Sequence, residues 1–269
     1  MSIKRQFSAR ELPFFYELYK GCDEVQDRYA GDVGDFGKIG MLRQIASTGL
    51  RIGINWYRTY KPEEHHRDDG KHIGYLSDKS FQGCDDELLN SLRRIVESNR
   101  SVAALEAAEL IPNAQYYSAI LRPGNDKSFN RDVWFKNSMK ALADSDVIFC
   151  DPDNGLIVKS VSLSSAKSDK YVTEDELVGY YLAGKSVVFY NHRCREKEHL
   201  YLRRFKPLQR RKELVSAKWL GLKFNRGTIR DYIFILQPYH CKKVSGALER
   251  MMQSNWKRHF SRLNIDKVE

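Results

Sequence analysis

The segment DVIFCDPDNG, which runs from Asp146 to Gly155, decides the fold class of this chain. Its apolar half predicts a buried strand, because turn-forming Asp, Pro, Asn and Gly follow it at once. Such strands are typical of parallel sheets that helices cover on both faces, and ligands of these sheets lie beyond the carboxyl ends of the strands. We therefore expect a catalytic role for Asp151, Pro152, Asp153 and Asn154. An ordinary strand-ending turn is the alternative.

Strands and helices alternate along the rest of the chain. The hydrophobic spacing predicts strands at 50–57, 185–192, 219–224 and 231–238, and helices at 8–20, 38–47, 85–98, 131–143, 173–183, 195–215 and from Val244 onwards. Thr173 and Glu176 have the spacing of a capping box. The link NRGTIR is too short for a crossover, so the last two strands are expected to be antiparallel.

These elements predict an α/β, Rossmann-like fold: a mostly parallel sheet with helices on both faces and an antiparallel final strand pair. We expect an N-terminal helical extension over residues 1–28 and a single domain over residues 29–269. The composition, 42% hydrophobic and 12% aromatic in 269 residues, excludes a disordered chain. No run reaches the ~18 apolar residues of a membrane span, and the first residues lack a secretory signal.

Five cysteines stand singly without a C-x-x-C pair, which argues against a disulfide framework or a structural zinc site. We therefore expect a cytoplasmic protein that makes no membrane contact.

The positive charge is concentrated in the last third of the chain. Residues 190–262 contain 19 Lys and Arg against 5 Asp and Glu, so the remaining residues of this +10 chain carry a net charge of −4. Basic side chains among aromatic ones suit a polyanion with bases that can stack. We therefore predict nucleic acid, RNA or DNA, as the partner. The predicted contacts are His192, Arg193, Arg203, Arg204, Arg210, Arg211 and Lys212. The alternative is a solvated helix face.

A glycine-rich segment from Tyr29 to Lys38 is the candidate cofactor loop. Backbone amides beside glycines can approach an anionic or cofactor group closely, and Lys38 could supply a charge. A loop that merely caps the next helix is the alternative. Two further polar residues, Asn55 and Glu106, are expected at strand ends. The candidate cofactor residues are thus Tyr29, Gly31, Asp35, Lys38, Asn55 and Glu106.

A polar segment from His65 to His72 is dense in imidazoles and carboxylates, which are metal ligands. Asp69 and His72 are the members we favour for a divalent metal, because Gly70 can bend the backbone beside a ligand. The spacing matches no established zinc pattern, so an exposed polar loop is the alternative.

The order of these motifs resembles class I S-adenosylmethionine-dependent methyltransferases. It is most similar to the large-subunit ribosomal RNA adenine-N6 methyltransferase family, whose motif H-A-G-N-x-A-D-x-x-K is matched at Ala30, Gly31, Asp35 and Lys38. The catalytic D-P-P-Y of that family falls on Asp151-Pro152-Asp153-Asn154. The resemblance extends over residues 28–260 and implies S-adenosylmethionine as the cofactor and a nucleic acid base as the substrate.

Two departures from that family keep other functions open. The first strand, LRIGINWY, delivers no glycine-rich loop, and Asn154 stands where the family has the aromatic that stacks on a flipped base. Trp56 or Tyr57 could supply that stacking face instead. A metal-dependent nuclease or phosphodiester hydrolase that uses Asp151 and Asp153 is the second hypothesis. A non-catalytic nucleic-acid-binding module is the third.

Overall fold

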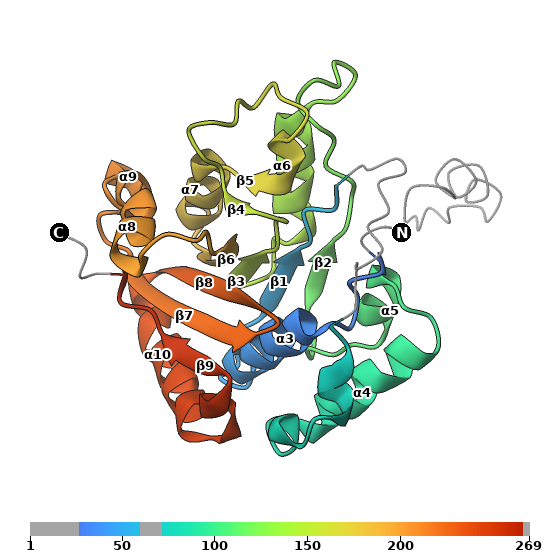
Figure 1. Cartoon of the computed structure of the whole chain (residues 1–269). Coiled ribbons are helices and arrows are strands. Elements are labelled where there is room, and N and C mark those ends of the chain that lie inside the picture. Colours follow the sequence, from blue (N-terminus) through green and yellow to red (C-terminus); the bar gives the residue numbers. More distant parts are fainter. Residues whose placement is uncertain (1–26, 60–71, 266–269) are drawn as a thin grey trace, which may run out of the picture.

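A seven-stranded mixed sheet forms the centre of the protein in the computed structural model, which describes residues 27–59 and 72–265 (Figure 1). The strand order is β2-β1-β3-β6-β8-β7-β9. The strands are β1 (Ile52–Asn55), β2 (Gln115–Tyr117), β3 (Val147–Cys150), β6 (Ser186–His192), β7 (Lys218–Arg226), β8 (Thr228–Leu236) and β9 (Phe260–Arg262). Two short strands, β4 (Gly155–Leu156) and β5 (Tyr171–Val172), pair separately. The predicted helix at 8–20 lies outside the described residues.

The parallel half of the sheet brings three strand ends together. β1 pairs in parallel with β2 and β3, and β3 pairs in parallel with β6. The register places Asn55 beside Cys150 and Cys150 beside Phe189. The residues that follow β1 and β3 and the last residues of β6 therefore lie along one edge of the sheet.

Helices cover both faces of the sheet, as predicted. They are α3 (Val33–Ala46), α4 (Asp86–Glu97), α5 (Val102–Ala107), α6 (Arg131–Ala141), α7 (Glu174–Leu182), α8 (Glu198–Leu202), α9 (Lys206–Gln209) and α10 (Pro238–Gln253). The capping box of α7 is confirmed, because Thr173 and Glu176 each accept a hydrogen bond from the backbone amide of the other.

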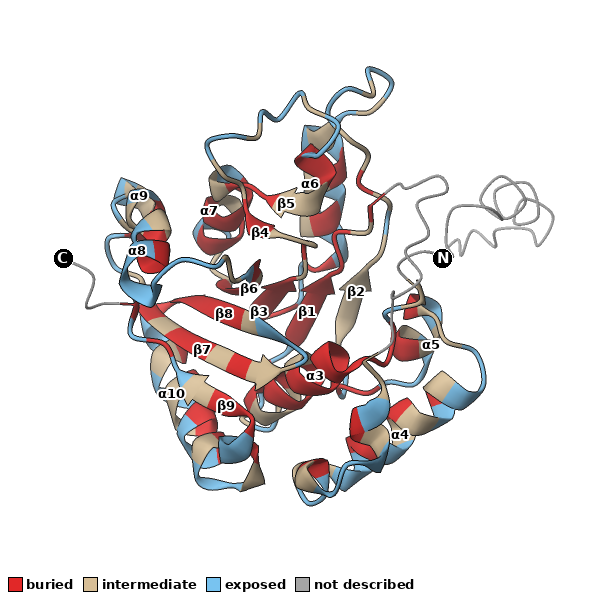
Figure 2. Cartoon of the chain, in the orientation of Figure 1, coloured by how far each residue is buried: buried red, intermediate tan, exposed pale blue. Residues whose placement is uncertain are grey.

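Two hydrophobic cores, one on each face, hold the helices against the sheet (Figure 2). Side chains alternate between the faces along a strand. Phe149 of β3 therefore packs with α3, α4, α5 and α10, whereas its neighbours Ile148 and Cys150 pack with α6, α7, α8 and α9. We call these sides the α3 face and the α7 face.

The final strand pair is antiparallel, and its turn is shorter than the sequence indicates. β7 and β8 pair from Lys218–Leu236 to Arg226–Thr228, so that most of NRGTIR belongs to the strands. Only Gly227 turns the chain, with a left-handed φ of 63° that glycine adopts without strain. β8 also pairs antiparallel with β6, which joins the two halves of the sheet.

The predicted continuous basic helix over 195–215 was wrong. That segment forms α8, a 3₁₀ turn at Arg203–Phe205, α9 and a second 3₁₀ turn at Lys212–Leu214. Pro207 stands in the first turn of α9, where its missing N–H is tolerated, but it cannot continue a helix that enters from α8. In the part of the chain that the structure describes, no helix combines the length and apolar character needed to cross a membrane.

Candidate functional site

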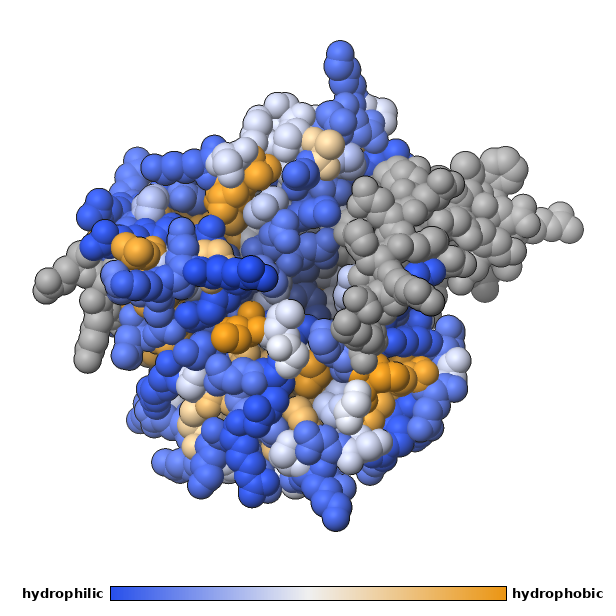
Figure 3. All heavy atoms as spheres, in the orientation of Figure 1, coloured by the Kyte–Doolittle hydropathy of each residue, from blue (hydrophilic) through white to orange (hydrophobic). Residues whose placement is uncertain are grey.

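A cavity of ≈ 530 Å³ opens at the edge where the parallel strands end, on the α3 face. Figure 3 shows this side of the molecule hollowed near its centre. The cavity brings together residues that are more than a hundred positions apart in the sequence. The predicted site residues that line it are Tyr29, Asp35, Lys38, His72, Asp151, Pro152, Asp153, Asn154 and His192.

The start of α3 forms one side of the cavity. Asp32 caps the helix by accepting a hydrogen bond from the Asp35 amide at 2.9 Å. Asp35 in turn accepts one from the Gly31 amide at 2.7 Å. Gly31 has a left-handed φ of 77°, which a residue with a Cβ rarely adopts. The Gly31 amide is therefore hydrogen-bonded within the loop, and Gly31 does not line the cavity.

The remaining glycines of this segment serve helix packing. α3 begins at Val33, five residues before the predicted start, and so contains Gly34, Gly37 and Gly40. A Cβ on these three glycines would collide with Arg230, Phe224 and Trp256 respectively. Their absent side chains let α3 lie close to the antiparallel half of the sheet, which overrides the poor helix propensity of glycine.

Lys38 joins the two predicted motifs. Its ammonium contacts Asp35 at 2.8 Å and donates a short hydrogen bond to Oδ2 of Asp151. The same ammonium lies 5.0 Å from the centre of the Trp56 ring. Burial alone would lower the pKa of Lys38, but the charges of Asp151 and Asp35 outweigh it and raise the pKa above the ordinary lysine value. Lys38 is therefore a fixed positive charge between two carboxylates.

The Asp151–Asn154 turn is held by backbone hydrogen bonds at three points. The Asp151 amide donates to Asn55 O, the Asn154 amide donates to Lys170 O, and the His192 amide donates to Asn154 O. Burial raises the pKa of Asp151, although Lys38 favours its ionised form. Oδ1 of Asp151 accepts no hydrogen bond from the described residues, and the Asp151 residue lines the cavity.

The opposite side of the cavity consists of residues of β6 and β8, of which only His192 was predicted from the sequence. Tyr190 of β6 lies beside Tyr232 of β8 in the antiparallel register, and His192 lies beside Arg230. All four line the cavity. Arg230 reaches across to Asp32 at 3.0 Å. The alternation of polar residues at 228, 230 and 232 is the signal of this row in the sequence, but Arg230 belongs to the link NRGTIR, which was expected to be a loop.

The Tyr232 hydroxyl is buried without a hydrogen-bond partner among the described residues. The residue is only 1% exposed, and its ring packs near Phe149, Tyr190 and Phe260. An unsatisfied buried polar group costs about 1–3 kcal/mol. Burial raises the pKa of Tyr232, so the phenol keeps its proton at neutral pH. Tyr232 lines the cavity and therefore places beside it a buried hydrogen-bond donor that the described residues leave unused.

Besides Gly31, two predicted cofactor residues do not line the cavity. Asn55 is fully buried and donates to the Tyr180 hydroxyl on the α7 face. Glu106 does not follow a strand as predicted, because it belongs to α5, and its Oε1 accepts a hydrogen bond from Trp56 Nε1 at 2.8 Å. Tyr57 is also unsuited to stacking on a ligand, since it is buried with its hydroxyl on Glu176. Trp56 does line the cavity.

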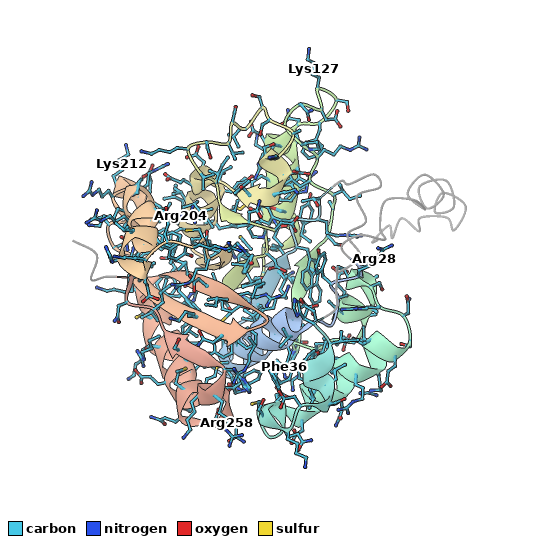
Figure 4. All side chains as sticks on the ribbon, in the orientation of Figure 1. Arg28, Phe36, Lys127, Arg204, Lys212 and Arg258 are labelled. Carbon is cyan, nitrogen blue, oxygen red and sulfur yellow. The ribbon has the colours of Figure 1, made fainter. Side chains whose placement is uncertain are left out.

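The predicted phosphate contacts divide into two groups. Arg193 is tied to the fully buried Asp231 and to Glu198, and Arg211 is tied to Glu213 and Asp175, so these two cations are structural. Arg203, Arg210 and Lys212 are exposed, and Arg204 lies over the Tyr201 ring. Figure 4 shows Arg204 and Lys212 together on the side of α8 and α9, away from Arg258 at the opposite end.

Only one of the two predicted metal ligands, His72, lies within the described residues. Asp69 lies outside the described residues, and His72 lines the cavity and accepts a backbone hydrogen bond from Val33. Within residues 27–59 and 72–265, no three His, Cys, Asp or Glu side chains are grouped so that they could hold a metal ion.

The geometry of the cavity separates two chemical zones. The least exposed polar residues of its lining, which we call the floor, are Asp32, Asp35, Lys38, Asp151, Arg230 and Tyr232. The more exposed polar residues, which we call the rim, are Tyr29, Arg58, Asp153, Lys170, His192 and Thr228. The floor can accept hydrogen bonds from an amino group, and the rim carries cations.

No family model and no curated protein sequence matches this chain.

Proposed function

We propose that the protein modifies a base in nucleic acid, and that the reaction is methyl transfer to the exocyclic amino group. The observation that carries this proposal is the division of the cavity into a carboxylate floor and a basic rim. A nucleotide that enters base first would place its amino group on the Asp151 carboxylate and leave its phosphate near Arg58 and Lys170. Enzymes that act on a base take it out of the stack in this manner.

The donor set of the cavity fits S-adenosylmethionine. The floor has three carboxylates and two cations. Lys38 is paired with Asp35 and Asp151, and Arg230 is paired with Asp32. This excess of negative charge suits the sulfonium and ammonium groups of that cofactor. The volume of ≈ 530 Å³ also falls within the range of roughly 300–1,000 Å³ that is usual for ligand pockets.

Asp151 is the residue that would handle the amino proton. Its Oδ1 is open to accept a hydrogen bond from the amino group, while Lys38 fixes Oδ2. Bound S-adenosylmethionine would supply an electrophilic methyl group. The amino nitrogen would use its lone pair for the new C–N bond as the C–S bond of the methyl donor breaks with its electron pair on sulfur, and Asp151 would accept the surplus proton and release it to water.

Labelled methyl transfer tests this proposal. The full chain is incubated with radiolabelled S-adenosylmethionine and either total RNA or genomic DNA, and calorimetry measures binding of the cofactor alone. We expect label in one of the two polymers, reduced at least ~100-fold by Asp151→Asn, because proton handling by a positioned group contributes about 10²–10⁴ to a rate. The exposed Asp144→Asn is the charge-matched control and should transfer label normally. Absence of cofactor binding at millimolar concentration contradicts the proposal.

A further inference from the structure

The buried hydroxyl of Tyr232 is the feature of the cavity that the fold does not explain. Among the described residues nothing lies within hydrogen-bond reach of it. The adjacent phenol of Tyr190 differs, because its hydroxyl is 3.1 Å from His192 Nδ1. Phenylalanine would keep the ring contacts of Tyr232 with Phe149 and Phe260. Packing alone therefore gives no reason for a tyrosine at this position.

The position of Tyr232 in β8 puts its side chain on the face of the sheet that lines the cavity. Alternate residues of a strand share one face, and Thr228, Arg230 and Tyr232 all line the cavity. They run from the exposed rim to the buried floor in that order. Lys38, Asp151 and Tyr232 all line this one cavity. A ligand that fills the cavity therefore lies against both Asp151 and Tyr232.

The two floor groups have complementary hydrogen-bonding character. The Asp151 carboxylate only accepts, whereas a neutral phenol donates. Adenine and cytosine present an amino group beside an unprotonated ring nitrogen, which is the matching donor and acceptor pair. Guanine, uracil and thymine present a carbonyl beside a ring N–H along the corresponding edge, and that carbonyl would be set against the carboxylate.

We propose that Tyr232 is a specificity-determining residue whose hydroxyl donates a hydrogen bond to the ring nitrogen next to the amino group of the substrate base. This assignment rests on the proposed function, because it takes the ligand to be a nucleotide with its base on the floor. Tyr232 would thereby select the base and fix the amino group against Asp151, without itself taking part in proton transfer.

Calorimetric titration with the four nucleoside 5′-monophosphates of adenosine, cytidine, guanosine and uridine tests the assignment. The wild-type chain should bind the adenosine or the cytidine nucleotide most tightly. Tyr232→Phe should weaken that binding about 10-fold and reduce the preference over guanosine and uridine nucleotides, because one hydrogen bond is lost. Its melting temperature should equal or exceed that of the wild type, since the unsatisfied hydroxyl is removed. Tyr239→Phe removes an exposed hydroxyl that donates to Gly184 O and is the matched control.

The outcomes separate this inference from the proposed function. If Tyr232→Phe binds all four nucleotides as the wild type does, or if the wild type binds none of them at millimolar concentration, the assignment is overturned. If methyl transfer is absent but Tyr232→Phe loses nucleotide affinity, the proposed reaction fails and the ligand contact stands. If methyl transfer occurs and Tyr232→Phe retains both rate and base preference, only the role of Tyr232 fails.

Discussion

The two sides of the cavity solve the problem of buried polar groups differently. On the side of α3 and β3, Asp35, Lys38 and Asp151 satisfy one another through short ionic contacts. On the side of β6 and β8, Tyr190 is paired with His192, but the hydroxyl of Tyr232 is left without a partner among the described residues. We call them the ionic wall and the phenol wall.

The difference indicates what each wall contributes. The ionic wall is a preorganised array, because each charge is already held by its neighbours before a ligand arrives. The phenol wall has unused hydrogen-bonding capacity and gains a partner only with a ligand. Removal of a group from the ionic wall should therefore reduce the stability of the free protein, whereas removal of the Tyr232 hydroxyl should reduce ligand affinity alone.

The largest expected effect on stability is at Lys38. Lys38→Met keeps most of the side-chain volume but leaves Asp35 and Asp151 buried without their cation. We expect the free energy of unfolding to fall by about 3–5 kcal/mol, as when one partner of a buried pair is removed. Urea denaturation at pH 7 measures this. Arg51→Met breaks only the exposed pair with Asp146 and should cost less than about 1 kcal/mol. Equal losses for both variants would contradict the ionic wall.

An intermediate effect is expected where α3 approaches the sheet. Gly37→Ala places a methyl group against the buried Phe224 ring, and such overpacking lowers the free energy of unfolding by about 1–3 kcal/mol. Gly246 of α10 is the matched control, because a Cβ there meets only Arg250 at 3.6 Å. Gly246→Ala should stabilise the protein by about 0.4–1 kcal/mol. Opposite signs in thermal unfolding would confirm that the α3 glycines set the position of the ionic wall.

The smallest expected effect depends on pH and concerns Glu106, which holds Trp56 beneath Lys38. Burial raises the pKa of Glu106. The folded protein therefore binds this proton more tightly than the unfolded chain, so the ionised carboxylate reduces stability above the folded pKa, and this penalty disappears as pH falls toward 4.5.

Glu106→Gln keeps the acceptor for Trp56 without the charge. It should raise the free energy of unfolding at pH 7, and the gain over wild type should shrink as pH falls from 7 toward 4.5. Paired urea titrations across that range measure the difference. A gain that grows on acidification would contradict the raised pKa.

Much of the fold could be predicted because the signals are local. The capping box at Thr173 and Glu176 and the apolar run at 147–150 require only neighbouring residues to be interpreted. The start of α3 could not be predicted in this way, since Gly34, Gly37 and Gly40 disfavour a helix locally. Their collisions with Arg230, Phe224 and Trp256 exist only once distant segments are packed together.

The candidate site was predicted in its parts and not in its assembly. Strand ends pointed to Asp151 and to Asn55 alike. Asp151 lies two residues after Phe149 and therefore on the same face, the α3 face. Asn55 directly follows Ile54 of the α3 face, so it points to the opposite face and bonds to Tyr180 of α7. Arg230 and Tyr232 were missed because they lie on an antiparallel strand whose beginning, not its end, reaches the cavity.

The sequence by itself determined that buried strands alternate with amphipathic helices, and that polar residues gather where those strands end. The tertiary structure alone decided which polar residues meet. Helices cover both faces of this sheet, so its central strands are apolar on each side and their hydrophobic pattern does not distinguish one face from the other. Only the packing of α3 against β7 and β8 decides on which face of the sheet the cavity forms. That packing puts Lys38 between Asp35 and Asp151 and leaves the Tyr232 hydroxyl without a partner among the described residues.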